Sequence, residues 1–436
     1  LIVEINMLKK AIKKILPVFC LSCYHWSLAR LAAFLFGHPS EKLIVIGVTG
    51  TNGKTTTVNL IAQLLECLGN KVGLSSTVNF KLAEKEWLNN KKMTMLGRFQ
   101  TQALLRQAVN ASCSYMVIES SSQGVAQFRH LGINYDLMVF TNLSPEHIEA
   151  HGGFDNYRAA KEKLFKHLVK NKRKKINNNI INKIIISNID DQENKRLEKI
   201  KADNFLTYGF KNKADLQGRD LVLENALAKF KVNEQKITTN FLGEFSAYNV
   251  LASLAVIKAL NLDFKKALTC KLKGVPGRQE LVDCKQNFKV MVDYAPEPES
   301  LKQLYSAIKE LKYNKLIHVL GSCGGGRDKA RQSILGQTAD KMADVIIITN
   351  EDPYDDDPQQ IIDKVAVGAK SKEINKNLFK ILDRKEAINK ALSLASDGDL
   401  VLITGKGAEQ AICVANNKKI PHDDREVVKR YFQNLK

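Results

Sequence analysis

The sequence predicts an α/β protein with two doubly wound sheets, because apolar strand-like runs alternate with helical runs along most of its 436 residues. A glycine-rich loop between the first strand and the next helix has the layout of a phosphate-binding loop, which indicates a P-loop ATPase domain. A Pro/Gly break near residue 276 precedes more strands with polar ends, which predicts a C-terminal Rossmann-like domain. We therefore expect an apolar and basic helical segment at 1–41, a central ATP-binding domain at 42–276 and a C-terminal domain at 277–436.

The composition is that of a globular protein with a strongly basic balance. Hydrophobic residues make up 44% of the chain, and the formal net charge is +20. Such a balance is compatible with nucleic acid, an anionic membrane surface or anionic substrates as partners. The basic run at 169–183 contains no aromatic residue, and the sequence carries no nucleic-acid-binding signature. We therefore expect a solvated basic face and no nucleic-acid partner.

The N-terminal segment joins a lysine-rich start to a mostly apolar run within residues 8–36. Pro17, His25 and Arg30 interrupt the run, which argues against a spanning helix. No small-residue cleavage site follows, which argues against export. Two interpretations stay open: an amphipathic segment on a membrane surface, or a helical pair packed on the catalytic domain, which we favour.

The eight cysteines are scattered, which is typical of a protein in a reducing cytoplasm. Cys20 and Cys23 form a CxxC motif, but no second pair completes a zinc site. On a helix this spacing places both side chains on one apolar face, so we expect them to pack in the core.

The loop at 50–55, GTNGKT, carries the clearest chemical signal. It follows an apolar run at 43–46, typical of a buried parallel strand, which we expect at 43–48, and it precedes apolar residues at helical spacing up to 68. Its glycines let backbone N–H groups close on phosphates, and the helix N-terminus adds a partial positive charge. The spacing is two residues shorter than the common loop, but strand and helix lie where the motif requires them. We expect ATP phosphates at Gly50, Thr51, Asn52, Gly53, Lys54, Thr55 and Thr56, with Lys54 at the terminal phosphates and Thr55 on magnesium.

Two further central strands, expected at 115–118 and 136–140, also end in polar residues. Ligands of doubly wound sheets bind at the carboxyl ends of the strands, so these ends indicate one crevice. Glu119 is placed either to ligate magnesium or to cap a helix. His147 is a metal ligand or a cap by the same reasoning. Lys161, judged by residue chemistry alone, is a solvated lysine on a helix.

The rest of the chain has weaker or simpler patterns. Residues 170–240 are rich in Lys and Asn, and we expect peripheral strands and loops there. A clear helix is expected at 243–260. The glycine-rich stretch 321–329 follows a strand but does not match G-x-G-x-x-G, so it is weak support for a dinucleotide site. The C-terminal domain is expected to place its strands at 288–292, 316–320, 344–348 and 400–403.

Many segments run in the order found in Mur ligases, and they cover about residues 43 to 430. They include TGTNGKTTT (49–57), TNLSPEHIEAHG (141–152), GRDKARQSILG (326–336) and IPHDDRE (420–426). The chain resembles the MurE type, which adds the third residue to UDP-N-acetylmuramoyl-dipeptide. The resemblance implies a monomeric, cytoplasmic, ATP-dependent ligase of peptidoglycan precursor synthesis. It would add an amino acid, a diamino acid by preference, to UDP-N-acetylmuramoyl-L-Ala-D-Glu through an acyl phosphate.

The resemblance also implies roles for single residues. Lys54, Lys161 and His147 would serve catalysis, with Lys161 carbamylated by CO2. Two magnesium ions would be held by Thr55, Glu119, His147 and the carbamate of Lys161. Asn249 would contact the adenine side of ATP, and Arg278 the phosphates across the domain gap. The acceptor and the incoming amino acid would contact Ser120, Ser121, Arg327, Asp352, Gly405 and Glu409.

Three departures from the family pattern bear on the substrate. First, only about forty residues precede the ATP-binding domain, so the UDP group would be held differently, or the acceptor would be lipid-linked. Second, the family's Asp-Asn-Pro-Arg reads Glu351-Asp352-Pro353-Tyr354 here. The loss of the arginine predicts a weaker preference for diaminopimelate and a side chain with a plain ammonium, such as that of lysine. Third, Gln123, Pro296 and Ala408 replace histidines, which indicates a diverged member.

Two alternative functions stay open. One is a relative that acts on another carboxylate acceptor, either a lipid-linked muropeptide or a folate-type substrate. The other is a basic P-loop ATPase that binds nucleic acid or membrane. The alternatives differ in what stimulates ATP turnover: a carboxylate acceptor with an amino acid in the first case, nucleic acid or lipid in the second.

Overall fold

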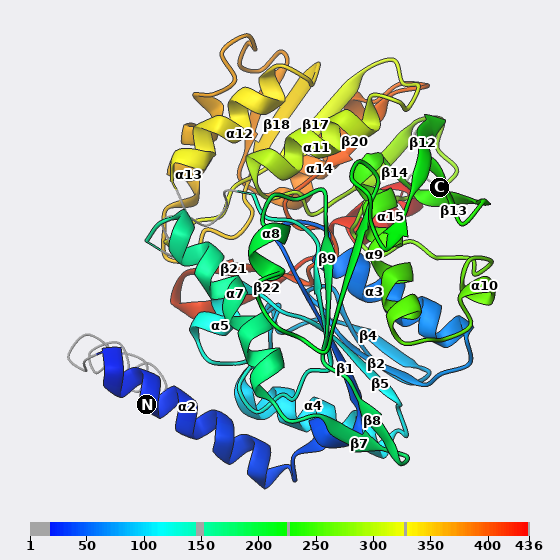
Figure 1. The fold of residues 1–436 in the computed structure, drawn as a ribbon. Coiled ribbons are helices and arrows are strands. Elements are labelled where there is room, and N and C mark those ends of the chain that lie inside the picture. The colour runs from blue at the N-terminus through cyan, green and yellow to red at the C-terminus, as the bar shows by residue number, and fades with distance from the viewer. Residues whose placement is uncertain (1–17, 145–151, 225–226, 327–328, 435–436) are drawn as a thin grey trace.

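The computed structural model describes residues 18–144, 152–224, 227–326 and 329–434, which fold around two large sheets (Figure 1). The first is a nine-stranded sheet in the central domain. Its strands run parallel from β11 to β2, and an antiparallel β2-β3-β4 edge completes it. The strand order is β11 (Leu216–Gln217), β10 (Asn204–Gly209), β9 (Ile184–Asn188), β6 (Leu137–Phe140), β1 (Ile44–Thr49), β5 (Tyr115–Glu119), β2 (Val72–Ser75), β3 (Asn79–Leu82) and β4 (Lys85–Leu88).

Part of the Lys/Asn-rich stretch lies inside this sheet, so its expected peripheral position is wrong for β9 and β10. The run Ile184, Ile185 and Ile186 is buried, and β9 pairs with β6 and β10. Burial of three consecutive isoleucines drives the strand into the sheet despite its polar flanks. β11 pairs with β10 at the edge of the same sheet. The other strands of the stretch form two small antiparallel sheets: β7 (Lys174–Ile176) with β8 (Asn179–Ile181), and β12 (Arg219–Glu224), β13 (Leu227–Val232) and β14 (Gln235–Leu242).

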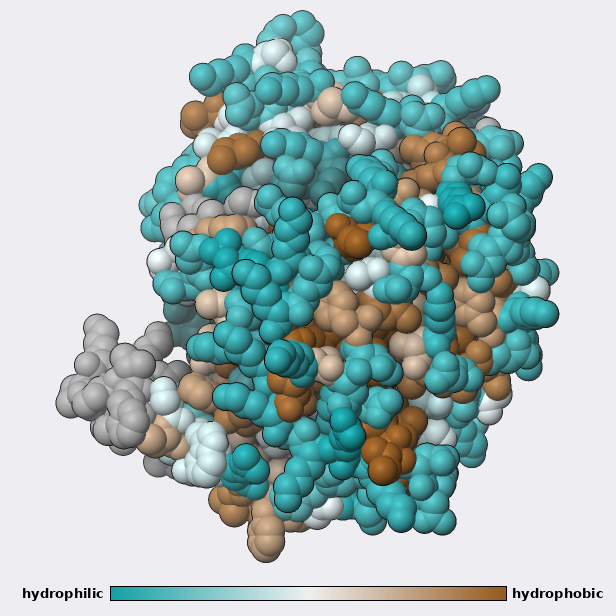
Figure 2. Space-filling model, viewed as in Figure 1, coloured by the Kyte–Doolittle hydropathy of each residue, from teal (hydrophilic) through white to brown (hydrophobic). Residues whose placement is uncertain are grey.

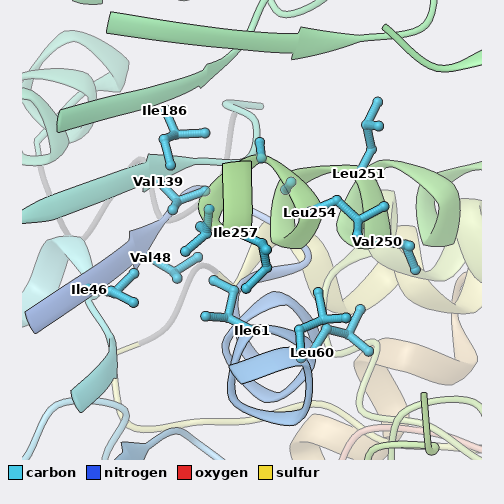
Figure 3. Packing of buried hydrophobic residues seen from close by; sticks show 14 of the residues in the cluster. Ile46, Val48, Leu60, Ile61, Val139, Ile186, Val250, Leu251, Leu254 and Ile257 are labelled. Atoms are coloured by element: carbon cyan, nitrogen blue, oxygen red, sulfur yellow. The ribbon is translucent and has the colours of Figure 1, made fainter. Parts of the chain in front are cut away.

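Helices cover both faces of the central sheet. α3 (Lys54–Cys67) and α9 (Glu244–Ala259) pack on one face, where their side chains meet those of β1, β6 and β9 (Figure 3). α4 (Arg98–Asn110) and α7 (Phe154–Lys170) pack on the other face. Shorter helices lie in the connections: η1 (Pro39–Lys42), α5 (Ser122–Ala126), α8 (Asn194–Leu197) and α10 (Phe264–Ala267).

The C-terminal domain is a second α/β layer structure around a six-stranded sheet. All neighbours run parallel except the β15-β16 pair. α11 (Pro298–Ile308), α12 (Ala330–Asp340) and α13 (Pro358–Ala366) cover one face, and α14 (Arg384–Leu394) and α15 (Asp424–Gln433) the other. The predicted α/β fold class is confirmed. The strand order is β15 (Glu280–Leu281), β16 (Lys289–Val292), β20 (Leu400–Ile403), β17 (Leu316–Leu320), β18 (Val345–Thr349) and β19 (Leu378–Ile381), and β21 (Ala411–Val414), η2 (Ala415–Asn417) and β22 (Lys418–Pro421) follow.

The described part of the N-terminal segment begins with the helix α2 (Val18–Leu35), which lies along the outside of the central domain (Figure 1) and is followed by η1. Its Ala29, Ala32 and Ala33 are fully buried, whereas Trp26 and Phe34 are exposed. No helix in the described part of the chain is both long and apolar enough to span a membrane. Residues 1–17 lie outside the described residues, so the expected helical pair is described only in its second half.

The cysteines differ from expectation at two places. Cys67, at the end of α3, and Cys270, after α10, form a disulfide with a Cα–Cα distance of 6.2 Å. Cys23 is exposed, so its expected core packing is wrong; the buried face of α2 is made of alanines instead. The face in Figure 2 is mostly hydrophilic with scattered apolar residues, as a chain with 26% charged residues predicts.

Candidate active site

A cavity of 490 Å³ lies between the two domains, at the carboxyl ends of β1 and β5. The phosphate loop and Glu119 line it from the central domain, and Arg278 and Tyr294 line it from the C-terminal domain. The crevice expected from the polar strand ends is therefore present, and its far wall comes from the other domain.

The glycines of the loop are required by close contacts. Gly53 precedes α3 with φ 80°, and a Cβ there would lie 2.2 Å from Asn249 Oδ1. A Cβ on Gly50 would lie 1.9 Å from Thr141 Oγ1. Neither position has room for a side chain, and the positive φ of Gly53 is unfavourable for other residues. The loop therefore turns tightly, and the N-terminus of α3 faces the cavity with its free N–H groups.

Thr55 and Glu119 bring a hydroxyl and a carboxylate together at the loop. Thr55 Oγ1 donates to Glu119 Oε2 at 2.9 Å, and Glu119 is only 2% exposed. The same carboxylate oxygen accepts from Thr77 N at 2.8 Å and from Thr77 Oγ1 at 3.0 Å. Hard oxygen donors beside a phosphate loop fit a magnesium ion. No cluster of three or more His, Cys, Asp and Glu that could hold a metal occurs within the described ranges, and His147 lies outside them.

Two lysines lie against the loop. Lys54 Nζ donates to the Thr51 carbonyl at 2.6 Å and lines the cavity. Lys161, on α7, is only 4% exposed, so the expectation of a solvated lysine from residue chemistry alone is wrong. Lys161 Nζ donates to the Gly50 carbonyl at 2.5 Å and lies 4.5 Å from the centroid of the Tyr157 ring. The fold thus brings a buried amine from 111 residues away to the phosphate loop.

The C-terminal domain contacts the loop directly. Arg278 Nη2 donates to Thr55 Oγ1 at 3.1 Å, and its guanidinium lies 4.4 Å from the centroid of the Tyr294 ring. Ser300 Oγ donates to Asn52 Oδ1 at 2.9 Å. A cation from one domain therefore reaches the residue that would hold magnesium on the other.

A second cavity of 260 Å³ adjoins the first, and Ser121, Gln123 and Tyr294 line both. Its C-terminal wall carries Glu351, Asp352, Tyr354 and Glu409, whereas Lys92 and Arg129 line it from the central domain. Burial disfavours the charge of Asp352, but Lys406 and Lys92 outweigh that effect and lower its pKa. The arrangement places a charged pocket next to the phosphate site.

The other expected site residues are distributed as follows. Asn249 lies on α9, and its Oδ1 accepts from Thr57 Oγ1 of α3 at 3.3 Å. Ser120 is fully buried against the Tyr135 hydroxyl at 3.2 Å, so the structure does not bring it to either cavity. Gly405 has φ 104° and faces Glu351. Arg327 lies outside the described residues, as does His147.

Sequence reasoning missed Thr77, Tyr157 and Lys92. Thr77 follows β2, and the rule that polar residues after apolar strands mark the site would have found it had this four-residue strand been recognised. Tyr157 Oη lies 3.1 Å from Thr51 Oγ1, and Tyr157 precedes Lys161 by one helical turn on α7. No local signal distinguishes Lys92 from the neighbouring lysine.

Comparison with known proteins decides the family. The Mur ligase middle domain matches residues 48–257, and the Mur ligase glutamate ligase domain matches residues 277–407. The UDP-N-acetylmuramoyl-L-alanyl-D-glutamate--2,6-diaminopimelate ligase of Geobacillus kaustophilus is 34% identical over 421 residues, which are 95% of this chain and 83% of the relative. The chain belongs to the Mur ligase family. The predicted resemblance to the MurE type is confirmed.

Solved structures show the same Mur ligase architecture. A UDP-N-acetylmuramoyl-L-alanyl-D-glutamate--2,6-diaminopimelate ligase structure has a TM-score of 0.57 at 29% identity, over 90% of this chain and 79% of the other. Folylpolyglutamate synthase of Mycobacterium tuberculosis, solved with ADP and AMPPCP, has a TM-score of 0.67 at 16% identity, over 87% of this chain and 92% of the other. The second likeness concerns the fold alone.

Proposed function

We propose that this Mur ligase is an ATP-dependent amino-acid ligase of peptidoglycan precursor synthesis, acting on UDP-N-acetylmuramoyl-L-Ala-D-Glu. The observation that carries the proposal is the pair of adjoining cavities, one at a phosphate loop with Thr55 and Glu119, the other at a charged pocket with Asp352 and Glu409. The relatives named as diaminopimelate ligases share about a third of the sequence over most of both chains, which supports the same reaction class.

The reaction must bring two anions together, the carboxylate of the acceptor and the triphosphate of ATP. A peptide carboxylate of the acceptor attacks the γ-phosphorus of ATP, giving an acyl phosphate and ADP. The amine of the incoming amino acid then attacks the acyl carbon, the amide forms and phosphate leaves. Lys54 and Arg278 supply positive charge where two anions must meet. Closure of the two domains over the substrates would limit the access of water to the acyl phosphate.

The residues at the phosphate loop fit magnesium, as judged by the hydroxyl and carboxylate donors that the structure brings together. Thr55 and Glu119 would hold it, together with His147 and Lys161 for a second ion. When bound, magnesium offsets the repulsion between the carboxylate and the triphosphate. Carbamylation of Lys161 by CO2 is part of the proposal, and its burial in the cavity wall beside Gly50 supports it.

The incoming amino acid is proposed to be a diamino acid with a plain ammonium at its end, such as lysine. Tyr354 lines the charged pocket at the position where diaminopimelate-adding members have an arginine. A phenol cannot form the bidentate ion pair that a guanidinium makes with a distal carboxylate. Diaminopimelate would therefore be a weaker substrate, although the printed names of the relatives refer to it.

Location and assembly are part of the proposal. ATP and a UDP-linked acceptor place the reaction in the cytoplasm, with the enzyme as a monomer. Peripheral membrane contact by residues 8–36 stays a prediction; within this stretch α2 exposes Trp26 and Phe34.

The deciding experiment measures phosphate release from ATP and Mg²⁺ with UDP-N-acetylmuramoyl-L-Ala-D-Glu and lysine, ornithine or diaminopimelate in turn, with mass spectrometry of the product. Release that requires both the acceptor and one amino acid, with the matching mass increase, is the expected result. Release without an amino acid, or none with this acceptor, would contradict the proposal. A lipid-linked or folate-type acceptor would then be tested in the same assay, and stimulation by nucleic acid would indicate a P-loop ATPase of another kind.

A further inference from the structure

Lys92 crosses from the central domain into the charged pocket of the C-terminal domain. It lies in the connection between β4 and α4, and its side chain is only 5% exposed. Its ammonium nitrogen lies 2.7 Å from Asp352 Oδ2, 2.7 Å from Glu409 Oε2 and 2.9 Å from the Ala411 carbonyl oxygen. These three contacts span 260 residues or more of sequence, so the tertiary fold alone creates them.

The ammonium group of Lys92 has no donor left for a substrate. A lysine ammonium carries three N–H donors, and the two carboxylates and the carbonyl accept one each. Lys92 therefore acts on the pocket through Asp352 and Glu409, which it orients and neutralises. Burial disfavours its charge, but Glu409 and Asp352 outweigh this and raise its pKa, so it stays protonated at neutral pH.

The same two acids are held from the other side by Lys406. Its ammonium lies 2.8 Å from Asp352 Oδ1 and 2.9 Å from Glu409 Oε2. Two lysines and two carboxylates thus form a cluster with no net charge. Both domains contribute to the cluster, because Lys406 belongs to the C-terminal domain and Lys92 to the central domain.

Among the described acids that line the second cavity, Glu351 is the one that this cluster does not pair with a lysine. It is only 2% exposed; its Oε1 accepts from Cys323 Sγ at 2.8 Å, and its Oε2 has no hydrogen-bond partner within the described residues. The nearby cation Arg384 is paired with Asp424 at 2.7 Å. A buried carboxylate with one unpartnered oxygen is costly unless a donor, best a cation, meets it.

We propose that Lys92 is a positioning residue for the amino-acid substrate. By neutralising Asp352 and Glu409 from across the domain gap, it leaves one carboxylate among the described residues that line the pocket, Glu351, to take one side-chain ammonium. The ammonium of the incoming diamino acid is thereby directed to a single place, which aligns its α-amine with the acyl phosphate. This inference rests on the proposed function. It assigns to Lys92 the task of leaving one negative charge in the pocket for the one side-chain ammonium of the substrate.

Removal of Lys92 gives the pocket a second uncompensated acid. In a Lys92→Met variant, Asp352 and Glu409 share only Lys406, so two sites compete for the substrate ammonium. We expect the KM for the amino acid to rise roughly 10- to 100-fold, as for the loss of a charged hydrogen bond, with the KM for ATP and for the acceptor nearly unchanged. A misplaced amine leaves the acyl phosphate to water, so phosphate release should exceed product formation.

Two comparisons separate positioning from a general structural role. Lys91→Met removes the same charge from an exposed neighbour and should leave every constant near the wild-type value. In Lys92→Ala, added propylammonium replaces the missing propyl amine and should restore the coupling of phosphate release to product. Tetramethylammonium, which has no N–H donor, should not restore it.

The outcomes distinguish this inference from the proposed function. A wild-type protein that makes no product with any amino acid would overturn both. An active wild-type protein with an unchanged amino-acid KM in Lys92→Met would overturn only the role of Lys92. So would equal increases in KM for ATP, acceptor and amino acid, because these would show a general loss of domain packing. A selective rise in the amino-acid KM with rescue by propylammonium would support it.

Discussion

At the scale of single residues, the structure explains why the phosphate loop has glycine at two positions. Gly50 and Gly53 are glycines because a Cβ at either position would meet Thr141 or Asn249, and Lys54 and Thr55 follow at the first turn of α3. The loop is shorter than the common form, yet it keeps the strand, the tight turn and the helix N-terminus that bind phosphate.

Lys54→Ala should abolish ATP turnover, with a loss of about 100-fold or more, because a preorganised cation at the terminal phosphates is removed. The measurement is phosphate release with saturating acceptor and amino acid. Lys71→Ala, an exposed lysine before β2, is the control. Retained turnover in Lys54→Ala would remove the assignment of the phosphate loop.

Lys161→Ala should lose activity and recover part of it when formate or acetate is added, because a short carboxylate can replace the proposed carbamate. The measurement is the initial rate with and without formate or acetate at about 50 mM, a concentration suited to a weakly bound ligand. Lys163→Ala, an exposed lysine on the same helix, should be unaffected. A fully active Lys161→Ala enzyme would show that the carbamate is not required.

Tyr354→Arg should shift the amino-acid preference toward diaminopimelate. Tyr354 has a positive φ of 52° and packs against Gly325. An arginine would have to adopt the same backbone conformation as the tyrosine, and it would add a guanidinium to the pocket. A new bidentate pair with the distal carboxylate should change the ratio of kcat/KM for diaminopimelate over lysine about tenfold. An unchanged ratio would mean that this position does not set specificity in this enzyme.

At the scale of helices and strands, one fully buried ion pair joins α15 to α14. Arg384 of α14 donates from Nε to Asp424 Oδ1 at 2.8 Å and from Nη2 to Asp424 Oδ2 at 2.7 Å. Both side chains have no solvent exposure. Burial opposes the charge of Asp424, but Arg384 and His422 outweigh it and lower the pKa of the carboxyl group.

Arg384→Met should reduce the free energy of unfolding by about 3–5 kcal/mol, because it leaves the Asp424 carboxylate buried without its partner. Urea unfolding followed by circular dichroism measures the change. Lys385→Met removes an exposed charge one residue away and should change stability little. Adding Asp424→Leu to Arg384→Met should recover part of the loss; a loss below about 1 kcal/mol in the single variant would contradict this account.

Strands were predicted well where they are apolar and end in a turn, and poorly where they are short or flanked by lysine and asparagine. β1, β5 and β6 were found within a residue or two of their ends. β2 has four residues, and β9 follows a basic run, so neither stood out from its surroundings. Their place in the sheet depends on pairing with β5 and β6, which no local pattern contains.

At the scale of the whole molecule, the site belongs to neither domain alone. The central domain supplies the phosphate loop, Glu119 and Lys92, and the C-terminal domain supplies Arg278 and the charged pocket. A small apolar cluster across the gap, with Val78 from one domain and Ala408 from the other, supports this arrangement.

Stability should fall as the pH drops below neutrality, because buried histidines stay neutral in the folded protein. Burial lowers the pKa of His318 from 6.5 to about 3. Between these values the unfolded chain binds a proton that the folded protein does not, so the free energy of unfolding decreases as pH falls, by up to about 1.4 kcal/mol per pH unit. His130, whose pKa burial also lowers to about 3, adds to the effect.

Urea unfolding of the wild type and of His318→Gln between pH 7.5 and 5 checks this expectation. The variant loses one titrating group, so its stability should depend less steeply on pH. His318 contacts Tyr305 at 2.6 Å and Thr404 at 2.9 Å, so some loss at neutral pH is also expected. Equal slopes for the two proteins would contradict the assignment.

The sequence by itself determined the α/β class, the phosphate loop and the family, because these depend on local periodicity, glycine positions and the order of short motifs. Only the tertiary structure decided that Lys161 is buried at the loop, that Arg278 contacts Thr55 and that Lys92 reaches Asp352. The physical reason is the separation along the chain. Contacts between residues 111 to 260 positions apart leave no periodic trace, since chain folding rather than local conformation brings them together.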